Sequence, residues 1–245
     1  MKHNEVYIFH DQDELAHTLA TVFIRDIQLL TKEKQAMIAI SGGNTPQRFY
    51  RILSGTDNAD YMKINWEKIH IFWCDERCVP PSDPDSNYGL AFKNLLKNIR
   101  IPEKNIHRIR GENMPEDEVK RYSAELREYV PLRGGLPDFD WVFLGLGEDG
   151  HTASIFPGQP ALLSSGNDCG MAVHPATGQR RISLTAKTIN NAGRITFIVT
   201  GASKSDKVGK ILKNLPDRED YPASHIIPVS GRLEWYLDKA AAQKT

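Results

Sequence analysis

Residues 141–151 read WVFLGLGEDGH, and this stretch decides the fold class of the chain. Residues 141–146 form a short run of apolar residues and glycine, typical of a strand that is covered on both faces of a sheet. Two carboxylates and two glycines follow, so the strand ends in a polar turn with His151 directly behind it. Strands of this kind occur in parallel sheets with helices on either side, and the stretch therefore predicts an α/β protein.

The rest of the chain alternates strands and helices in the same way. Further strands are predicted at 6–9, 36–40, 69–73, 181–185 and 194–200, and helices after Asp11 or Asp13, at Pro46, at 86–98, at about 116–130 and at 203–212. No repeat or linker divides the chain. We therefore expect a single domain over residues 1–245, built on a mostly parallel sheet flanked by helices.

Composition excludes several classes of function. The 31 basic and 31 acidic residues balance, so no overall charge favours nucleic acid or an anionic membrane as a partner. No apolar run is long enough to cross a membrane, and the N-terminus does not resemble a secretory signal, so we expect a cytoplasmic protein. Cys74 and Cys78 have the spacing of half a metal site, but no second pair follows, and reduced thiols are the simpler interpretation.

Three polar loops follow predicted strands: SGGNTP at 41–46, DERCVPP at 75–81 and GEDGHTAS at 147–154. Ligands of parallel α/β sheets bind beyond the carboxyl ends of the strands, where such loops meet. The sequence therefore predicts an active site formed by these loops.

The loop at 41–46 can bind a phosphate. Its glycines let main-chain N–H groups approach an anion, and the helix that follows carries partial positive charge at its start. A tight turn with a hydroxyl cap explains the same residues equally well. The loop is neither a Walker motif nor a dinucleotide fingerprint, so a small phosphorylated substrate fits better than a nucleotide. The candidate ligands are Ser41, Gly42, Gly43, Asn44 and Thr45.

Charged residues follow two strands and lie within a third. Asp75 and Arg77 can orient polar groups and hold a phosphate, or they can form an ion pair at the end of the sheet. Lys204 follows the strand at 194–200 and can add a second positive charge, or it can be a solvated lysine at the start of a helix. Arg181 has the same two interpretations.

His151 is the candidate catalytic residue. A histidine titrates near neutral pH, so it can remove a proton from water, and Asp149 can hold it in one tautomer. The alternative is a helix capped by Asp149 with His151 in the core. The sequence shows no paired-histidine metal motif and no nucleophile elbow, so we expect no metal and no covalent serine mechanism.

Taken together, these segments resemble the 6-phosphogluconolactonase family, within the group that includes the glucosamine-6-phosphate deaminases. The resemblance rests on five segments in the same order along the chain: SGGNTP (41–46), DERCVP (75–80), SNY (86–88), LGLGEDGHTASIFPG (144–158) and GASK (201–204). It implies a Rossmann-like α/β domain without a cofactor.

The resemblance also implies the reaction: hydrolysis of 6-phospho-D-glucono-1,5-lactone to 6-phosphogluconate in the oxidative pentose phosphate pathway. His151 matches the general base of the family, and Asp75 and Asp149, which fall on family motifs, are the two further candidate catalytic residues. The substrate-binding positions are the loop at 41–45 with Arg77, Arg181 and Lys204.

Two alternatives remain. The similar deaminases carry a glutamate five positions after the histidine, where this chain has Phe156, so deamination is the less favoured activity. A sugar-phosphate sensor without catalysis would keep the phosphate loop and would not need His151. The sequence does not reveal the oligomeric state.

Overall fold

A computed structural model describes residues 5–55 and 64–245. Its centre is a parallel seven-stranded sheet, ordered β1 (Glu5–Phe9), β12 (Arg232–Asp238), β11 (Arg194–Val199), β8 (Trp141–Leu144), β2 (Ala36–Ile40), β3 (Ile69–Trp73) and β5 (Ile106–His107). The predicted α/β class with a parallel sheet is confirmed.

The order of strands reverses beside β2. From β2 the chain adds β3 and β5 on one side, whereas β8, β11 and β12 extend the sheet on the other side. At such a reversal, the loops after the two neighbouring strands lead away from each other and leave a crevice. Here the crevice lies beyond β2 and β8, which are followed by the loops at 41–46 and 145–152.

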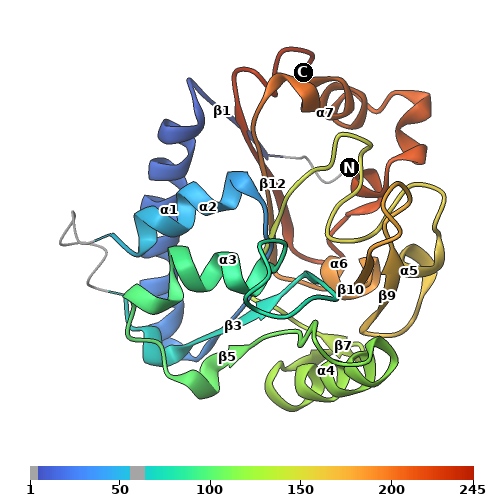
Figure 1. Ribbon diagram of the computed structural model, residues 1–245. Helices are drawn as coiled ribbons and strands as arrows, with labels where there is room; N and C mark the ends of the chain where they lie inside the picture. Colours follow the sequence, from blue (N-terminus) through green and yellow to red (C-terminus); the bar gives the residue numbers. More distant parts are fainter. Residues whose placement is uncertain (1–4, 56–63) are drawn as a thin grey trace.

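Helices cover the sheet on both faces (Figure 1). The helices are α1 (Gln12–Glu33), α2 (Asn44–Leu53), α3 (Asn87–Asn94), α4 (Pro115–Tyr129), α5 (Ala161–Ser164), α6 (Ala186–Asn190) and α7 (Ser205–Leu212). Asp11 caps α1, because its carboxylate accepts the main-chain N–H groups of Asp13 and Glu14. The buried face of α1 includes Leu15, Leu19, Phe23 and Ile27, at helical spacing.

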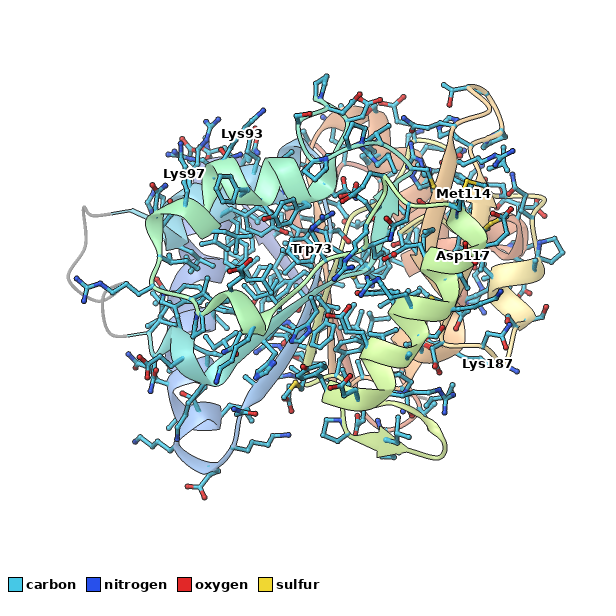
Figure 2. All side chains as sticks on the ribbon, turned by 60° about the horizontal axis from the view of Figure 1, so that its bottom comes forward. Trp73, Lys93, Lys97, Met114, Asp117 and Lys187 are labelled. Carbon is cyan, nitrogen blue, oxygen red and sulfur yellow. The ribbon has the colours of Figure 1, made fainter. Side chains whose placement is uncertain are left out.

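The core lies between these helices and the four central strands. Every residue of β2, β3, β8 and β11 is buried. Trp73, at the end of β3, lies inside the molecule, whereas Lys93 and Lys97 stand at the surface (Figure 2). Each large apolar side chain buried in this way contributes about 1.5–3 kcal/mol relative to an exposed one. The strand ends are thus held in a rigid frame.

A smaller antiparallel sheet lies beside the main one. It consists of β4 (Asp75–Arg77), β10 (Arg180–Leu184) and β9 (Cys169–Val173), and β6 (Leu132–Arg133) pairs with β7 (Leu136–Pro137) as a separate hairpin. The strand predicted at 181–185 therefore exists, but it belongs to this second sheet. It pairs antiparallel with β4, the segment that follows β3, and the two strands together line one side of the crevice.

Several predicted boundaries shift. The strand expected at 141–146 ends at Leu144, where the glycine-rich loop begins, and the helix expected at 86–98 ends at Asn94 and is followed by a 3₁₀ turn at Leu96–Asn98. Likewise a 3₁₀ turn at Ala202–Lys204 precedes α7. No strand was predicted at β12, which carries the buried Glu234; its charge is balanced by Arg194, whose Nε lies 2.7 Å from the carboxylate.

Candidate active site

A pocket of about 420 Å³ lies beyond the carboxyl ends of β2, β3, β8 and β11. Its wall brings together nine of the residues expected from the sequence: Ser41, Gly42, Gly43, Thr45, Asp75, Arg77, His151, Arg181 and Lys204. The side chain of Asn44 lies outside the described part of the structure. Asp149 does not line the pocket, but contacts it through His151.

His151 is held by Asp149. The Nδ1 atom of His151 lies 2.6 Å from the Oδ1 atom of Asp149, and the main-chain N–H of His151 donates to the same oxygen. Burial opposes the charge of Asp149, but the hydrogen bond and charge of His151 outweigh it and lower the pKa of this carboxyl to about 2. An ionised carboxylate only accepts, so neutral His151 carries its proton on Nδ1 and keeps Nε2 as a proton acceptor.

The turn around His151 and Asp149 has room only for glycine at position 147. A Cβ atom on Gly147 would lie 2.0 Å from the Nδ1 atom of His151 and 2.6 Å from the Asp149 carboxylate. The main-chain N–H of Gly147 also donates to the carbonyl of His151. Asp149 caps no helix, because the chain continues in turns after Gly150, and this excludes the alternative of a capped helix with a core histidine.

Asp75 is buried at the start of β4, just beyond the end of β3, with donors on two sides. Its carboxylate accepts from Ser154 Oγ at 2.6 Å and from Asn87 Nδ2 at 3.2 Å, and Arg181 Nη1 lies 4.0 Å away. Arg77 instead donates through Nη1 to the carbonyl of Asp85. Among the described residues Arg77 forms no ion pair with Asp75, so the alternative of a local ion pair does not describe this site.

Arg77 and Arg181 lie opposite each other on the antiparallel strands β4 and β10. Two like charges in this position destabilise a sheet unless an anion or a carboxylate balances them. Burial lowers the pKa of Arg181, and the charge of Arg77 acts in the same direction. Both side chains line the pocket, so this wall favours an anionic or strongly polar ligand.

The loop after β2 forms the opposite wall. The helix α2 begins here without a side-chain cap, which leaves its first N–H groups available to an anion. Thr45 Oγ1 lies 2.9 Å from Thr200 Oγ1 and so joins this loop to the one after β11. Ser41 is already engaged, since its hydroxyl donates to the carbonyl of Phe143.

Lys204 completes this wall. It lines the pocket, and its Nζ atom lies 3.7 Å from a carboxylate oxygen of the exposed Glu148. The ammonium group is thus part of the pocket, whereas the alternative of a fully solvated lysine does not fit its position.

Comparison with known proteins agrees with this geometry. The family described as glucosamine-6-phosphate isomerases/6-phosphogluconolactonase matches residues 10–235. The chain is 48% identical to a 6-phosphogluconolactonase of Haemophilus influenzae, with 84% of this chain and 86% of the relative covered. The chain belongs to the 6-phosphogluconolactonase family.

Solved structures support the same membership. A crystal structure of a devB protein superposes with a TM-score of 0.91 at 40% identity, covering 98% of both chains. A 6-phosphogluconolactonase from Trypanosoma brucei superposes with a TM-score of 0.88 at 27% identity, covering 99% of both.

Phe156 stands where the resemblance to the deaminases implied a glutamate in those proteins. Phe156 is fully buried, and its ring centre lies 4.9 Å from that of His151 and 5.1 Å from that of His174. The guanidinium of Arg181 lies 5.5 Å from the same ring. An apolar ring therefore packs beside the histidine, at the position where a glutamate was expected for a deaminase.

Three residues that surround Asp75 have no role predicted from the sequence: Glu76, Asn87 and Ser154. Glu76 is buried and accepts the main-chain N–H groups of Arg77, Asn87 and Tyr88, and burial raises its pKa to about 7. The segment SNY, quoted above only for its resemblance, was the one signal that pointed to Asn87.

Within residues 5–55 and 64–245, no three histidine, cysteine, aspartate or glutamate side chains converge in a way that could hold a metal ion. In the same ranges no helix is both long and apolar enough to cross a membrane.

Proposed function

We propose that the protein hydrolyses 6-phospho-D-glucono-1,5-lactone to 6-phosphogluconate, with His151 as the general base. The observation that carries the proposal is the His151–Asp149 pair, which faces a pocket lined by Arg77, Arg181 and Lys204. The curated relatives named 6-phosphogluconolactonase support the substrate. The reaction belongs to the oxidative pentose phosphate pathway.

Catalysis begins with water. Nε2 of His151 takes a proton from a water molecule, whose oxygen forms a bond to the lactone carbonyl carbon and generates a tetrahedral oxyanion. Main-chain N–H groups of a glycine-rich loop stabilise this charge. The bond from the carbonyl carbon to the ring oxygen then breaks, and the imidazolium of His151 returns its proton to that oxygen. Asp149 stabilises the imidazolium throughout, and no metal or organic cofactor takes part.

The phosphate of the substrate anchors it. The loop at 41–45 offers main-chain N–H groups and the hydroxyl of Thr45, and Lys204 and Arg77 supply positive charge. Asp75 and Arg181 orient the polar groups of the sugar ring. Binding energy gained at the phosphate thereby holds the carbonyl near His151.

The two alternatives have different requirements. Isomerisation and deamination of glucosamine 6-phosphate need additional acid and base groups, and Phe156 supplies none beside His151. A sensor without catalysis needs the anion-binding walls but has no use for the close His151–Asp149 hydrogen bond. We also propose that residues 1–245 form one domain, which the pairing of β1 with β12 supports, and that the protein is cytoplasmic.

The decisive experiment adds purified protein to freshly prepared 6-phosphogluconolactone and follows acid release, with the spontaneous rate subtracted. We expect turnover well above the spontaneous rate and no ammonia from glucosamine 6-phosphate. Ammonia release would support the deaminase instead. Binding of 6-phosphogluconate without any turnover of the lactone would support the sensor.

A further inference from the structure

Asn87, the first residue of α3, lies between two walls of the pocket. Its side chain is 2% exposed and lines the pocket together with Gly42 and Asp75. The amide Nδ2 donates to the main-chain carbonyl of Asp75 at 2.8 Å and to its carboxylate at 3.2 Å. Both partners only accept hydrogen bonds, so the orientation of the amide is determined by chemistry: Nδ2 faces Asp75, and Oδ1 faces the other way.

On its other side Asn87 contacts the loop after β2. A Cβ atom on Gly42 would lie 1.8 Å from Oδ1 of Asn87, so residue 42 must be glycine while Asn87 is in place. Oδ1 is buried and finds no hydrogen-bond donor among the described residues. The amide thus fills the space between the proposed phosphate loop and the carboxylate of Asp75.

The start of α3 is itself held in position. Ser86 caps the helix and donates to the carboxylate of Glu76, which also accepts the main-chain N–H of Asn87. Asp75 and Glu76 are consecutive residues of β4, so the helix start is joined to this strand by the side chain and the main chain of Asn87. Such a double attachment leaves the amide little freedom to move away from Asp75.

We propose that Asn87 is a positioning residue that fixes the distance across the pocket between the Asp75 carboxylate and the Gly42 main chain. This inference rests on the proposed function, in which the loop at 41–45 anchors the phosphate and Asp75 orients the sugar ring. Both anchors act on the same small molecule, so their separation decides whether the carbonyl reaches His151. Asn87 acts through these neighbours and touches no reacting atom.

The change of Asn87 to aspartate tests the role with little change of shape. An oxygen would replace Nδ2 and face the two acceptors of Asp75, which is favourable only when the pair of carboxyl groups holds a proton. The titratable groups that act on Asp75 are Glu76 on the same strand, Arg181 on β10, and the buried side chains of Cys74 and Tyr50. Activity of Asn87→Asp, divided by that of the wild type at each pH, should therefore recover as the pH falls.

The measurement is kcat/KM for 6-phosphogluconolactone from pH 5 to pH 8, corrected for spontaneous hydrolysis. We expect Asn87→Asp to be about 10- to 100-fold below the wild type at pH 8 and to approach it at pH 5. Asn87→Ala should show a loss of about 10-fold at every pH, without recovery. The matched control is Asn94→Asp on the same helix, where Arg51 Nε donates to the side-chain oxygen; its ratio to the wild type should stay flat.

A flat ratio for Asn87→Asp, or an Asn87→Ala variant as active as the wild type, would overturn the positioning role while leaving the proposed function intact. A wild-type protein without lactonase activity would overturn the proposed function and this inference with it. Thermal unfolding of each variant at both ends of the pH range separates loss of the fold from loss of positioning.

Discussion

His151 owes its proposed reactivity to one neighbour. The 2.6 Å contact with Asp149 commits Nδ1 and leaves Nε2 to exchange protons with water. Because the pKa of Asp149 is lowered to about 2, this carboxylate stays ionised above about pH 4, and its own titration adds no acid limb to the activity in that range. The charge that stabilises a protonated His151 is therefore present under all ordinary assay conditions.

The cationic residues of the pocket are expected to bind the phosphate of the substrate. We expect Arg77→Ala and Lys204→Ala each to raise KM for the phosphorylated lactone, because a charge-assisted contact to phosphate contributes about 1.5–3 kcal/mol, less where solvent screens it. Neither change should much affect the slow reaction of unphosphorylated gluconolactone. Measuring KM and kcat for both variants on both lactones checks this.

Lys187→Ala is the matched control, since Lys187 is exposed on α6 and stands at the surface in Figure 2. Equal losses on the two lactones would mean that Arg77 and Lys204 serve the fold or the chemical step, and the phosphate anchor would then lie elsewhere.

At the scale of elements, side chains of β3, β5 and α4 form a series of hydrogen bonds that is separate from the pocket. Nδ1 of His70 lies 2.9 Å from Nε2 of His107, whose Nδ1 lies 2.9 Å from the carboxylate of Glu125. Burial lowers the pKa of His70 to about 4, and the charges of His107 and Lys104 add to the effect. In the unfolded chain the same histidine takes up a proton near pH 6.5.

The hydrogen-bonded series of His70, His107 and Glu125 predicts that the stability of the protein depends on pH. Between about pH 6.5 and pH 4 the unfolded state binds a proton at His70 that the folded state does not, so the free energy of unfolding falls as the pH falls through this range. From pH 7 to pH 5 the loss from this site is up to about 2 kcal/mol. Urea unfolding at both pH values measures it, and His70→Gln should reduce the difference.

Glutamine keeps a donor for His107 but does not titrate in this range. His17→Gln, a change at an exposed histidine of α1, is the control and should leave the difference unchanged. The same pH dependence in His70→Gln and in the wild type would show that His70 does not contribute to the pH dependence of stability.

The sequence predicted the elements whose local pattern is unambiguous. The runs AMIAI, IHIFW and RITFIV are strands, because apolar runs of five or six residues between polar turns are too short for a buried helix. β12 escaped prediction because Glu234 is a charge in the middle of it, and only the fold shows that Arg194 balances this charge. β4 was assigned to a loop because Asp75, Glu76 and Arg77 are all charged.

The sequence predicted which loops form the site, but not which side chains contact each other within it. The placement of the loops follows from the rule for parallel sheets, and nine of the expected residues line one pocket. The roles of Asn87 and Ser154 depend on distances between segments far apart in the chain, such as the 2.6 Å contact of Ser154 with Asp75, and no local pattern encodes such a distance.

At the scale of the whole molecule, the order of strands joins chemistry from distant parts of the chain. β2 and β8 are neighbours although about a hundred residues separate them, so the loop at 41–46 meets the loop that carries His151. The small sheet adds Arg77 and Arg181 from another side. The pairing of β1 with β12 brings the first and last strands together at one edge of the main sheet (Figure 1).

The most direct test of the account is the turnover of 6-phosphogluconolactone by His151→Ala, corrected for the spontaneous rate. We predict a loss of about 10²- to 10⁴-fold in kcat, because the general base is removed while both anion-binding walls remain. The variant should still unfold cooperatively and bind 6-phosphogluconate. A folded His151→Ala protein with nearly wild-type turnover would contradict the assignment of His151 as the base.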